Sequence, residues 1–532
     1  MNAMVVRFGP EARRPMLRGI DTLADLVART IGPSGRAVLV GRRHAMPQLC
    51  RNGYGIARDL ELQAPAEQVG VVMLRELAWR TSDAVGDGTK TAILAARALL
   101  RAGGRASLLG IPPAELTGLL ASHQRAVLDA LNDMALPSPR GEAIASFATQ
   151  AAGGDPALGA LLAEAHDAAG ADGMVVVEAG QGADDAVRFA AGLHLEQGWF
   201  SPHLVGDLAS ATIELDDPLI LLHAGPIDRL EPVLRVLEMI AAAGRSLVII
   251  ADAFSEQALA TLVANKRRAG LEVAAIKAPG AGPWRRLLLE DIAVATGATL
   301  IAPELGTSLE GMRPHVMGRA TSVRIGRNAT TIIGGRGDEA AIAVRVAQIR
   351  QAIARERHLG FDREQHQQRL ARLTAGIATL TVGGVTPSHL HDRLEQARNA
   401  SAAVASALVG GLVAGGSAAL VHATVRAGSS LPTGLVGELL RRMFQAAAEA
   451  PLRAIVRNAG ADADLEVPRL VLQPGLAFEA HERRLVPLET LREPLLVVRT
   501  SFRNAVSAAG RLLTVECALA APRRHQPAAV GS

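Results

Sequence analysis

Apolar residues recur every three or four positions near both ends of the chain, a spacing that predicts amphipathic helices. The first such helix covers residues 16–27 and ends before Gly32-Pro33. A second apolar stretch, 71–100, is interrupted by Gly86-Asp87-Gly88, so we expect two helices joined by a loop. Helical periodicity returns after Gly376 and continues to the C-terminal third. Both ends of the chain are therefore predicted to be mainly helical.

Short β-rich runs alternate with helical segments in the middle of the chain. The predicted strands are 219–222, 246–250 and 273–276, and the predicted helices are 231–243 and 255–266. Such alternation is typical of an α/β domain, which we place at about 192–377. Because helices flank this insert on both sides, the two termini are predicted to share one discontinuous domain.

The composition is that of a large folded protein. The chain has 532 residues, of which 49% are hydrophobic and 20% charged, so it is expected to form more than one domain. The sequence pI of about 9.6 accompanies a formal net charge of only +4. Arginines account for most of the 56 basic residues, and no basic block occurs, so no nucleic acid partner is expected.

Cysteine usage and hydropathy bear on the compartment. The two cysteines, Cys50 and Cys517, form no Cys-x-x-Cys pair, and the N-terminus has no secretory pattern. These features favour a reducing cytoplasm without disulfides or a zinc site. No apolar run reaches about 18 residues, so no membrane span is expected.

Two short motifs carry candidate chemistry. Gly86-Asp87-Gly88-Thr89-Lys90-Thr91 offers backbone N–H groups, hydroxyls and a carboxylate at a helix start, which suits phosphates and Mg²⁺. The same residues are also ordinary helix-capping chemistry. Thr30-Ile31-Gly32-Pro33 has the pattern of a simple helix end. Neither motif decides the function by itself, and the first is not a Walker A sequence.

Further motifs extend over nearly the whole chain in a characteristic order. They are Phe8-Gly9, Met16-Leu17-Arg18-Gly19, Thr30-Ile31-Gly32-Pro33, Gly86-Asp87-Gly88-Thr89, Gly198-Trp199-Phe200-Ser201-Pro202, Ala258-Leu259-Ala260-Thr261-Leu262-Val263, Lys277-Ala278-Pro279-Gly280, Glu339-Ala340-Ala341-Ile342, Arg345-Val346-Ala347-Gln348-Ile349-Arg350 and Val413-Ala414-Gly415-Gly416. By these residues the chain resembles the group I, GroEL-type chaperonins and is identified as a divergent member of that family.

The resemblance implies an α+β multidomain fold. It consists of a mostly helical, discontinuous equatorial domain, a small intermediate domain in two pieces and an α/β apical domain. The implied boundaries are 1–133 and 410–532 for the equatorial domain, 134–190 and 378–409 for the intermediate domain and 191–377 for the apical domain. The resemblance also implies a homo-oligomeric double ring and leaves open a GroES-type cochaperonin.

An ATP and Mg²⁺ site is implied in the equatorial domain. The matching positions are Thr30, Ile31, Gly32, Pro33, Arg51, Asp87, Gly88, Thr89, Lys90, Thr91, Gly416 and Glu493, with Asp87 as the Mg²⁺ ligand. Lys90 replaces a threonine of the family, and its ammonium could compensate phosphate charge, replace a monovalent metal ion or simply reach water. Glu493 matches an acidic ribose contact, whereas Ala477 lies near the position that reads the base.

Two positions depart from the family at its catalytic carboxylates. A Lys-Asp-Gly turn reads Arg51-Asn52-Gly53 here, and an acidic helix position falls on Asn399. An amide cannot accept a proton from the attacking water, so we expect slow or absent ATP hydrolysis. A one-turn slip of the match would place Glu395 near the second position instead.

The apical domain carries the positions that match the family's surface for non-native polypeptides. They are Trp199, His203, Leu204, Leu234, Leu237, Leu259, Val263 and Ala264. Spacing alone favours core positions for the leucine pairs, because one apolar face of a helix is usually buried. The resemblance favours an exposed recognition surface instead.

Two functional hypotheses follow from these features. The first is an ATP-driven folding machine that binds non-native polypeptides. The second is a chaperonin-like scaffold without hydrolysis, which could assemble with an active paralogue. Asp87 fits both hypotheses, whereas Asn52 and Asn399 favour the second. A metabolic α/β enzyme is discounted, because no catalytic or metal-ligand constellation occurs at useful spacing.

Overall fold

The computed structural model forms two compact units, which we describe separately. Unit 1 consists of Met1–Ala163 and Glu395–Ser532, and unit 2 of Glu164–Leu394. Both termini therefore belong to unit 1. The structure describes all residues except 1–4, 43–44, 105–108, 171–173, 181, 206–211, 229–233, 235–236, 239, 242–243, 310–315, 356–359, 375 and 521–532.

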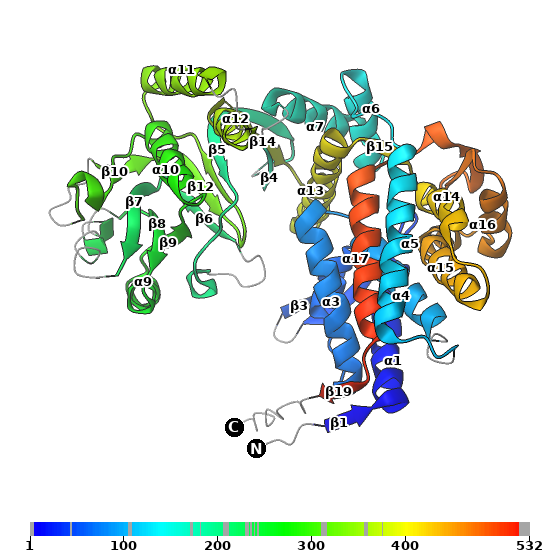
Figure 1. The fold of residues 1–532 in the computed structure, drawn as a ribbon. Coiled ribbons are helices and arrows are strands. Elements are labelled where there is room, and N and C mark those ends of the chain that lie inside the picture. Colours follow the sequence, from blue (N-terminus) through cyan, green and yellow to red (C-terminus); the bar gives the residue numbers. More distant parts are fainter. Residues whose placement is uncertain are drawn as a thin grey trace. The chain divides into compact units, whose positions relative to one another are not determined.

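Unit 1 is mainly helical, as the apolar periodicity predicts (Figure 1). Its helices are α1 (Gly9–Ala28), α2 (Gly53–Asp59), α3 (Pro65–Val85), α4 (Thr89–Gly103), α5 (Pro113–Asp133), α6 (Glu142–Ala151), α14 (Ala418–Ala427), α15 (Leu435–Asn458), α16 (Ala463–Leu472) and α17 (Leu495–Leu513). Two more, α7 (Pro156–Ala169) and α13 (Pro387–Gly410), run across the limits of the units. Among the described residues, no helix has both the length and the apolar character that a membrane crossing requires.

The strands of unit 1 are short and form four two-stranded sheets. The pairs are β1 (Val5–Phe8) with β19 (Cys517–Ala520), β2 (Val38–Arg42) with β3 (Ala45–Cys50), β15 (Leu412–Ala414) with β18 (Arg492–Pro494), and β16 (Leu476–Glu479) with β17 (Arg484–Pro487). All four pairs are antiparallel, and the first joins the two ends of the chain.

The helices of unit 1 pack closely against one another, and glycines allow the closest approach. The helix α4 packs against α15 and α17, and α1 packs against α3. A Cβ atom at Gly70 on α3 would lie 2.1 Å from the carbonyl oxygen of Met16, and one at Gly19 would lie 1.9 Å from that of Glu67. Glycine is required at both positions, because only a residue without a side chain permits this approach of α1 and α3.

Unit 2 contains two sheets and the helices that cover them. The strands are β4 (Met174–Ala179), β5 (Ala186–Leu195), β6 (Ile213–Asp216), β7 (Leu219–Ile227), β8 (Leu247–Phe254), β9 (Val273–Lys277), β10 (Leu300–Ile301), β11 (Gly318–Arg319), β12 (Ser322–Ile325), β13 (Thr330–Ile333) and β14 (Gly376–Val382). The described helices are α9 (Glu256–Ala269), α10 (Pro283–Thr296), α11 (Glu339–Arg355) and α12 (Gly360–Thr374), with short 3-10 turns such as η2 (Pro202–Leu204).

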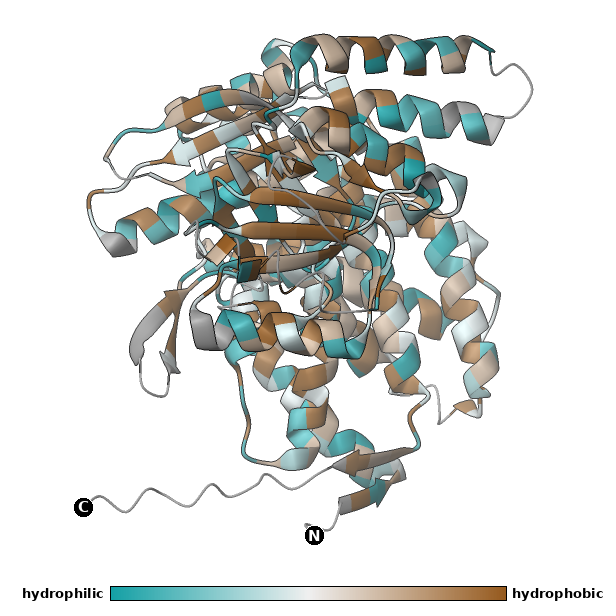
Figure 2. Cartoon of the chain, turned by 90° about the vertical axis from the view of Figure 1, so that its left-hand side faces the viewer, coloured by the Kyte–Doolittle hydropathy of each residue, from teal (hydrophilic) through white to brown (hydrophobic). Residues whose placement is uncertain are grey.

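The first sheet has the order β10-β7-β8-β9 with parallel neighbours, and β11 pairs antiparallel with β7. Its strands are almost entirely buried, as expected for a parallel sheet covered on both faces. Figure 2 shows these strands in the brown of hydrophobic residues. The second sheet has the order β4-β14-β5-β13-β12-β6. The predicted α/β character of the middle of the chain is thus confirmed.

The local predictions for unit 2 agree with its elements. The predicted strands lie within β7, β8 and β9, apart from Ser246, which directly precedes β8. The helix predicted over 255–266 is α9, and the hydroxyl of Ser255 caps it by accepting a hydrogen bond from the backbone N–H of Ala258. Much of the helix predicted over 231–243 lies outside the described residues, and its described positions, including Leu234 and Leu237, are helical.

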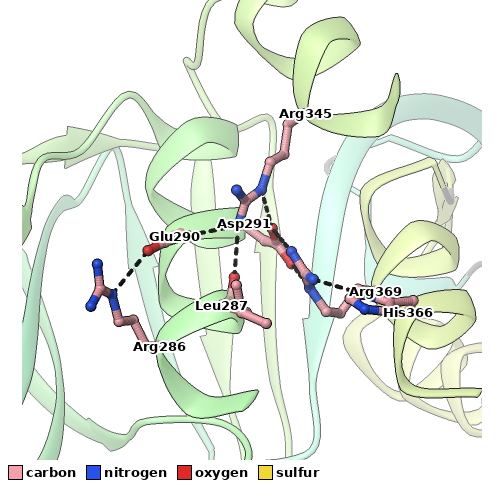
Figure 3. A network of polar contacts seen from close by, with 7 residues as sticks. All are labelled: Arg286, Leu287, Glu290, Asp291, Arg345, His366 and Arg369. Carbon is pink, nitrogen blue, oxygen red and sulfur yellow. Dashed lines mark hydrogen bonds and ion pairs between the residues drawn. The ribbon is translucent and has the colours of Figure 1, made fainter. Parts of the chain in front are cut away.

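A buried ionic network fastens α11 and α12 to α10 (Figure 3). The carboxylate of Asp291 on α10 accepts hydrogen bonds from Arg369 on α12 at 2.7 and 2.8 Å and from Arg345 on α11 at 2.7 Å. Arg345 also pairs with Glu290 at 3.0 Å, and Arg369 contacts His366. Only 6% of the Asp291 side chain and 5% of that of Arg369 are exposed, so this ion pair is shielded from water.

Candidate functional site

The loop between α3 and α4 presents the start of α4. Gly86 ends α3 in the left-handed conformation, and Gly88 has a φ of 79°. A Cβ atom at Gly88 would lie 2.0 Å from the hydroxyl oxygen of Ser501, so only glycine fits this position. The carboxylate of Asp87 accepts a hydrogen bond from the N–H of Gly88 at 2.6 Å, which fixes its orientation. The predicted loop is confirmed, and it carries an acid at a helix N-terminus.

The turn after α1 is held by a residue from the other end of the chain. The side-chain amide of Asn458 on α15 donates hydrogen bonds to the carbonyl oxygens of Ala28 and Ile31, both at 2.8 Å. Gly32 has a φ of 81°, and a Cβ atom there would come within 3.2 Å of Ile455. The buried hydroxyl of Thr30 donates to the carbonyl oxygen of Val27. The backbone of this turn is therefore fixed by α15.

These two loops line one cavity of about 530 Å³ in unit 1. Nine of the twelve predicted ATP-binding residues lie in its wall: Ile31, Gly32, Pro33, Asp87, Gly88, Lys90, Thr91, Gly416 and Glu493. Thr30 and Thr89 are buried behind this wall, and the exposed Arg51 does not line the cavity. The structure thus brings most of the predicted positions together from four separate segments of the chain.

The rest of the wall comes from residues that local motifs do not indicate. These residues are Gln150, Gly153, Gly154, Ser417, Ile455, Phe478, Glu479, Ala480, His481, Leu491 and Val497. Gln150 donates a hydrogen bond to the carbonyl oxygen of Arg492 at 2.6 Å and accepts one from its N–H. Phe478 and Glu479 end β16, and Ala480 and His481 begin the turn that leads to β17, whereas Ala477 is fully buried in the core. The turn lines this end of the cavity, and Ala477 does not.

Glu493 brings a buried carboxyl group to the cavity. It lies on β18, opposite Val413 on β15, and accepts a hydrogen bond from the backbone of Ser417. Burial, together with the negative charge of Asp87, raises the pKa of Glu493 to about 8. Its Oε1 atom is buried and has no hydrogen-bond partner within the described part of the chain. A buried polar atom without a partner is costly, so a ligand hydroxyl that meets it would be stabilised.

Lys90 provides a positive charge close to these acids. Its Nζ atom donates a hydrogen bond to the carbonyl oxygen of Thr30 at 2.8 Å. Burial is the main effect and lowers the pKa of Lys90, while the charges of Asp87 and Glu395 act in the opposite direction. The ammonium is therefore directed to the turn after α1.

The turn that replaces the family's Lys-Asp-Gly lies beside the start of α4. A Cβ atom at Gly53 would lie 2.7 Å from the hydroxyl oxygen of Thr89 and 2.9 Å from Cγ of Lys90. Asn52 caps α2, because its Oδ1 atom accepts hydrogen bonds from the N–H groups of Tyr54 at 2.9 Å and Gly55 at 3.4 Å. Asn52 does not line the cavity in this structure.

Asn399 and Glu395 lie on the face of α13 that meets the α3–α4 loop. A Cβ atom at Gly86 would lie 2.5 Å from Cβ of Ala402, so α13 touches this loop three residues after Asn399. Residues at i, i+4 and i+7 share one helix face, which places Glu395, Asn399 and Ala402 on the same stripe. The charge of Glu395 acts against the lowering of the Lys90 pKa by burial, whereas Asn399 carries no charge. Both candidates for the second acidic position thus remain on the relevant face.

The donor set fits Mg²⁺ only together with phosphates. Among the described residues, no group of three or more His, Cys, Asp and Glu side chains could hold a metal ion. Mg²⁺ is commonly held by one or two carboxylates and by substrate phosphates, with water completing its shell. Asp87, which is exposed at the cavity wall and oriented by Gly88, fits that requirement.

The predicted polypeptide-binding positions divide into two groups in unit 2. Leu234 is 37% exposed, His203 is exposed, and Trp199, Leu259 and Val263 are half-buried, as is Ala264. The helix α9, which carries three of these residues, packs against η2, which carries His203. The backbone of Trp199 bridges to that of Ile276 on β9.

Leu204 and Leu237 are different, and the structure corrects the exposed positions predicted for them. Their exposed fractions are 0% and 3%, and both belong to the core of unit 2. In this conformation they support the sheet and cannot contact a bound chain. The core alternative that the helical spacing favours therefore applies to these two leucines.

Comparison with known proteins adds two findings. The sequence profile described as the TCP-1/cpn60 chaperonin family matches residues 23–523. Among solved structures, the chain is similar to the chaperonin gp146 from the bacteriophage EL 2 (Pseudomonas aeruginosa), crystallised in the presence of ATP-BeFx. The TM-score is 0.70 at 16% sequence identity, and the similarity covers 97% of this chain and 99% of the phage protein. At that identity the structural likeness concerns the fold.

Proposed function

The chain belongs to the TCP-1/cpn60 chaperonin family, and from this premise we propose that it is a group I-type chaperonin subunit that binds ATP with Mg²⁺. In this proposal it captures non-native polypeptides in the cytoplasm, and its hydrolysis of ATP is impaired. A chaperone role follows from the family itself. The nucleotide, the hydrolysis defect and the division into equatorial, intermediate and apical domains are the parts that we propose.

The cavity in unit 1 is the observation that carries this proposal. It joins the glycine-rich start of α4, the turn after α1, Gly416 and the buried acid Glu493 around one space of about 530 Å³. Backbone N–H groups at a helix N-terminus favour phosphates. The unpartnered Oε1 atom of Glu493 offers a hydrogen-bonding position to a sugar hydroxyl. These features support a phosphate chain at one end of the cavity and a ribose beside β18.

The proposed defect in hydrolysis rests on two amides. Asn52 and Asn399 stand where the family has carboxylates, and an amide cannot take up the proton of an attacking water. Asn52 is moreover engaged as the cap of α2. These observations favour a second candidate function, in which the chain is a scaffold without turnover or a partner of an active paralogue. Glu395, on the same face of α13, is the acid that could accept the proton of the attacking water in place of Asn399.

Assembly into a ring is supported by the short sheets of unit 1. Exposed apolar residues lie on the pair β2–β3, where Leu39 and Leu49 are 65% and 59% exposed, and on the pair β1–β19, where Phe8 and Leu519 are 65% and 58% exposed. Among the described strands each of these sheets has two members. Two-stranded sheets are marginally stable, and open apolar edges invite pairing with another chain. We therefore propose that these edges pair between subunits.

Nucleotide binding to the full-length protein tests the proposal. Calorimetric titration with ATP and Mg²⁺ should give saturable binding to the parent, and Asp87→Ala should weaken it by about tenfold or more, because the metal-bound phosphates lose their carboxylate partner. Asp129→Ala, on the exposed side of α5 and away from the cavity, is the matched control and should bind like the parent. Absence of binding by the parent, or equal affinity of the parent and Asp87→Ala, would contradict the site assignment.

A further inference from the structure

Lys90 joins three segments that come together at the cavity. Its backbone belongs to the first turn of α4, and its Nζ atom donates a hydrogen bond to the carbonyl oxygen of Thr30 at 2.8 Å, in the turn after α1. Its side chain passes Gly53, at the start of α2, where a Cβ atom would lie 2.9 Å from Cγ of Lys90. The ammonium thus links the two loops that surround the proposed phosphate position.

The electrostatic surroundings of this ammonium contain charges of both signs. Burial, the largest effect, and the charge of Arg51 disfavour its charged form, whereas the carboxylates of Asp87 and Glu395 favour it. The carbonyl oxygen of Thr30 accepts one of the three N–H donors that an ammonium carries. Because Lys90 itself lines the cavity, its other donors are available to an anion there.

An ammonium in this position resembles an alkali cation in chemistry. Carbonyl oxygens can replace the hydration shell of K⁺, and phosphates attract monovalent cations as counterions. A cation placed between a carbonyl oxygen and a phosphate oxygen would therefore link the turn after α1 to a nucleotide. Lysine also binds phosphates as a point charge and donates hydrogen bonds to the same oxygens.

We propose that Lys90 acts as a covalently attached monovalent cation of the nucleotide site, bridging the carbonyl oxygen of Thr30 and the phosphates of the bound nucleotide. It occupies the place that a free K⁺ or Na⁺ ion would otherwise take. Nucleotide affinity is consequently independent of the monovalent cation in solution and depends on Lys90. This inference rests on the proposed function, since it assigns a role in nucleotide binding.

A role confined to structure makes a different prediction. If Lys90 only held the turn after α1 through Thr30, its replacement would lower the thermal stability of the empty protein without creating a dependence on monovalent cations. The dependence of affinity on the cation is therefore the readout that separates the two roles.

The test is a calorimetric titration of the full-length protein with ADP and Mg²⁺ in three buffers of equal ionic strength. Their monovalent cation is K⁺, Na⁺ or the bulky N-methylglucamine. The variants are Lys90→Met, which keeps a flexible stem without charge, and Lys90→Thr, which offers a hydroxyl oxygen to a free cation. Lys277→Met, at an exposed position of β9 in unit 2, is the control. Circular dichroism of each variant checks folding.

The parent and Lys277→Met should show the same affinity in all three buffers. Lys90→Met should bind about 10- to 100-fold more weakly in each buffer, as expected for the loss of one charge-assisted hydrogen bond. Lys90→Thr should be equally weak in N-methylglucamine and should recover in K⁺, because the free ion can then enter. A variant that fails to fold leaves the other variant and the cation series of the parent as tests.

Three results would overturn the inference. A parent whose affinity rises strongly with K⁺ would show that a free cation is still required. Lys90→Met with the affinity of the parent would show that the ammonium does not contact the nucleotide. These two outcomes leave the proposed function intact, because the parent still binds nucleotide. A parent that binds no nucleotide in any buffer would instead overturn the proposed function and this inference together.

Discussion

Asn52 illustrates how one residue can serve structure while a catalytic group is absent. Its side chain accepts two backbone hydrogen bonds at the start of α2, and asparagine and aspartate are about equally good in that position. Capping therefore does not explain why an amide stands here in place of a carboxylate. It does mean that Asn52→Asp should fold with α2 intact, so the chemistry of this position can be tested separately from its structure.

Glu493 makes the stability of the protein without nucleotide depend on pH. Its pKa is raised from 4.5 to about 8 in the folded protein, mainly by burial. Between these two values the folded protein holds a proton that the unfolded chain has lost, so raising the pH through this range destabilises the fold. Below about pH 4.5 Glu493 is protonated in both the folded and the unfolded state, so it contributes nothing to the pH dependence of stability there.

Glu493→Gln should remove this dependence. In the absence of nucleotide the Tm of the variant should match that of the parent at pH 5 and should exceed it increasingly up to pH 9. The corresponding difference in unfolding free energy should be on the order of a few kcal/mol. Thermal melts at pH 5, 7 and 9 check this, with the exposed Glu489→Gln as control. A Tm difference that does not change with pH would mean that Glu493 is ionised in the folded protein.

Among the elements, α11 and α12 depend on the ionic network around Asp291. One carboxylate there faces two arginines, Arg345 and Arg369, from two different helices (Figure 3). Removing the charge of Asp291 takes away the counter-charge that Arg369 has in this network, while Arg345 keeps its pair with Glu290. Leaving a buried charge without its partner is far more costly than losing an exposed pair.

Asp291→Asn should therefore loosen both helices. We expect a loss of about 3–5 kcal/mol in the stability of unit 2. Hydrogen exchange of peptides from α11 and α12 measures it locally, because a chain of two units need not unfold in one step. Glu290→Gln removes the charge of the more exposed partner of Arg345. It should change the free energy of opening measured by hydrogen exchange by less than about 1 kcal/mol. Unchanged protection of α12 in Asp291→Asn would show that apolar packing alone holds it.

The sequence predicts an element well when neighbouring residues determine it, and poorly when segments far apart in the chain do. The loop at Gly86 and Gly88 and the cap at Ser255 are set by neighbouring residues, so local patterns predict them. The residues from Phe478 to His481, at the end of β16 and in the turn after it, line the cavity only because α15, β16 and β17 fold against distant segments. No local signal indicates that. Spacing also could not tell that Leu237 is buried, because a core face and a binding face have the same helical period.

For the whole molecule, the resemblance predicts the α+β fold and membership of the chaperonin family, and both are confirmed, whereas the group I type stays a prediction. The division into three domains stays a prediction, since the chain separates into two compact units by its contacts. The proposed edge pairing of β1–β19 and β2–β3 would join subunits through unit 1, which also holds the cavity. ATP turnover should therefore be measured on the assembled oligomer.

Phosphate release by the purified oligomer of verified mass tests most directly whether this chaperonin subunit, as we propose, binds ATP but hardly hydrolyses it. The parent should release phosphate at a rate close to the background set by Asp87→Ala. The double variant Asn52→Asp, Asn399→Asp should be faster by about 10²-fold or more, because carboxylates can accept the proton of the attacking water. Either change alone should recover less, since both groups address one reacting water. A parent that already turns over as fast as the double variant, and loses this activity in Glu395→Gln, would contradict the claim and assign the missing role to Glu395.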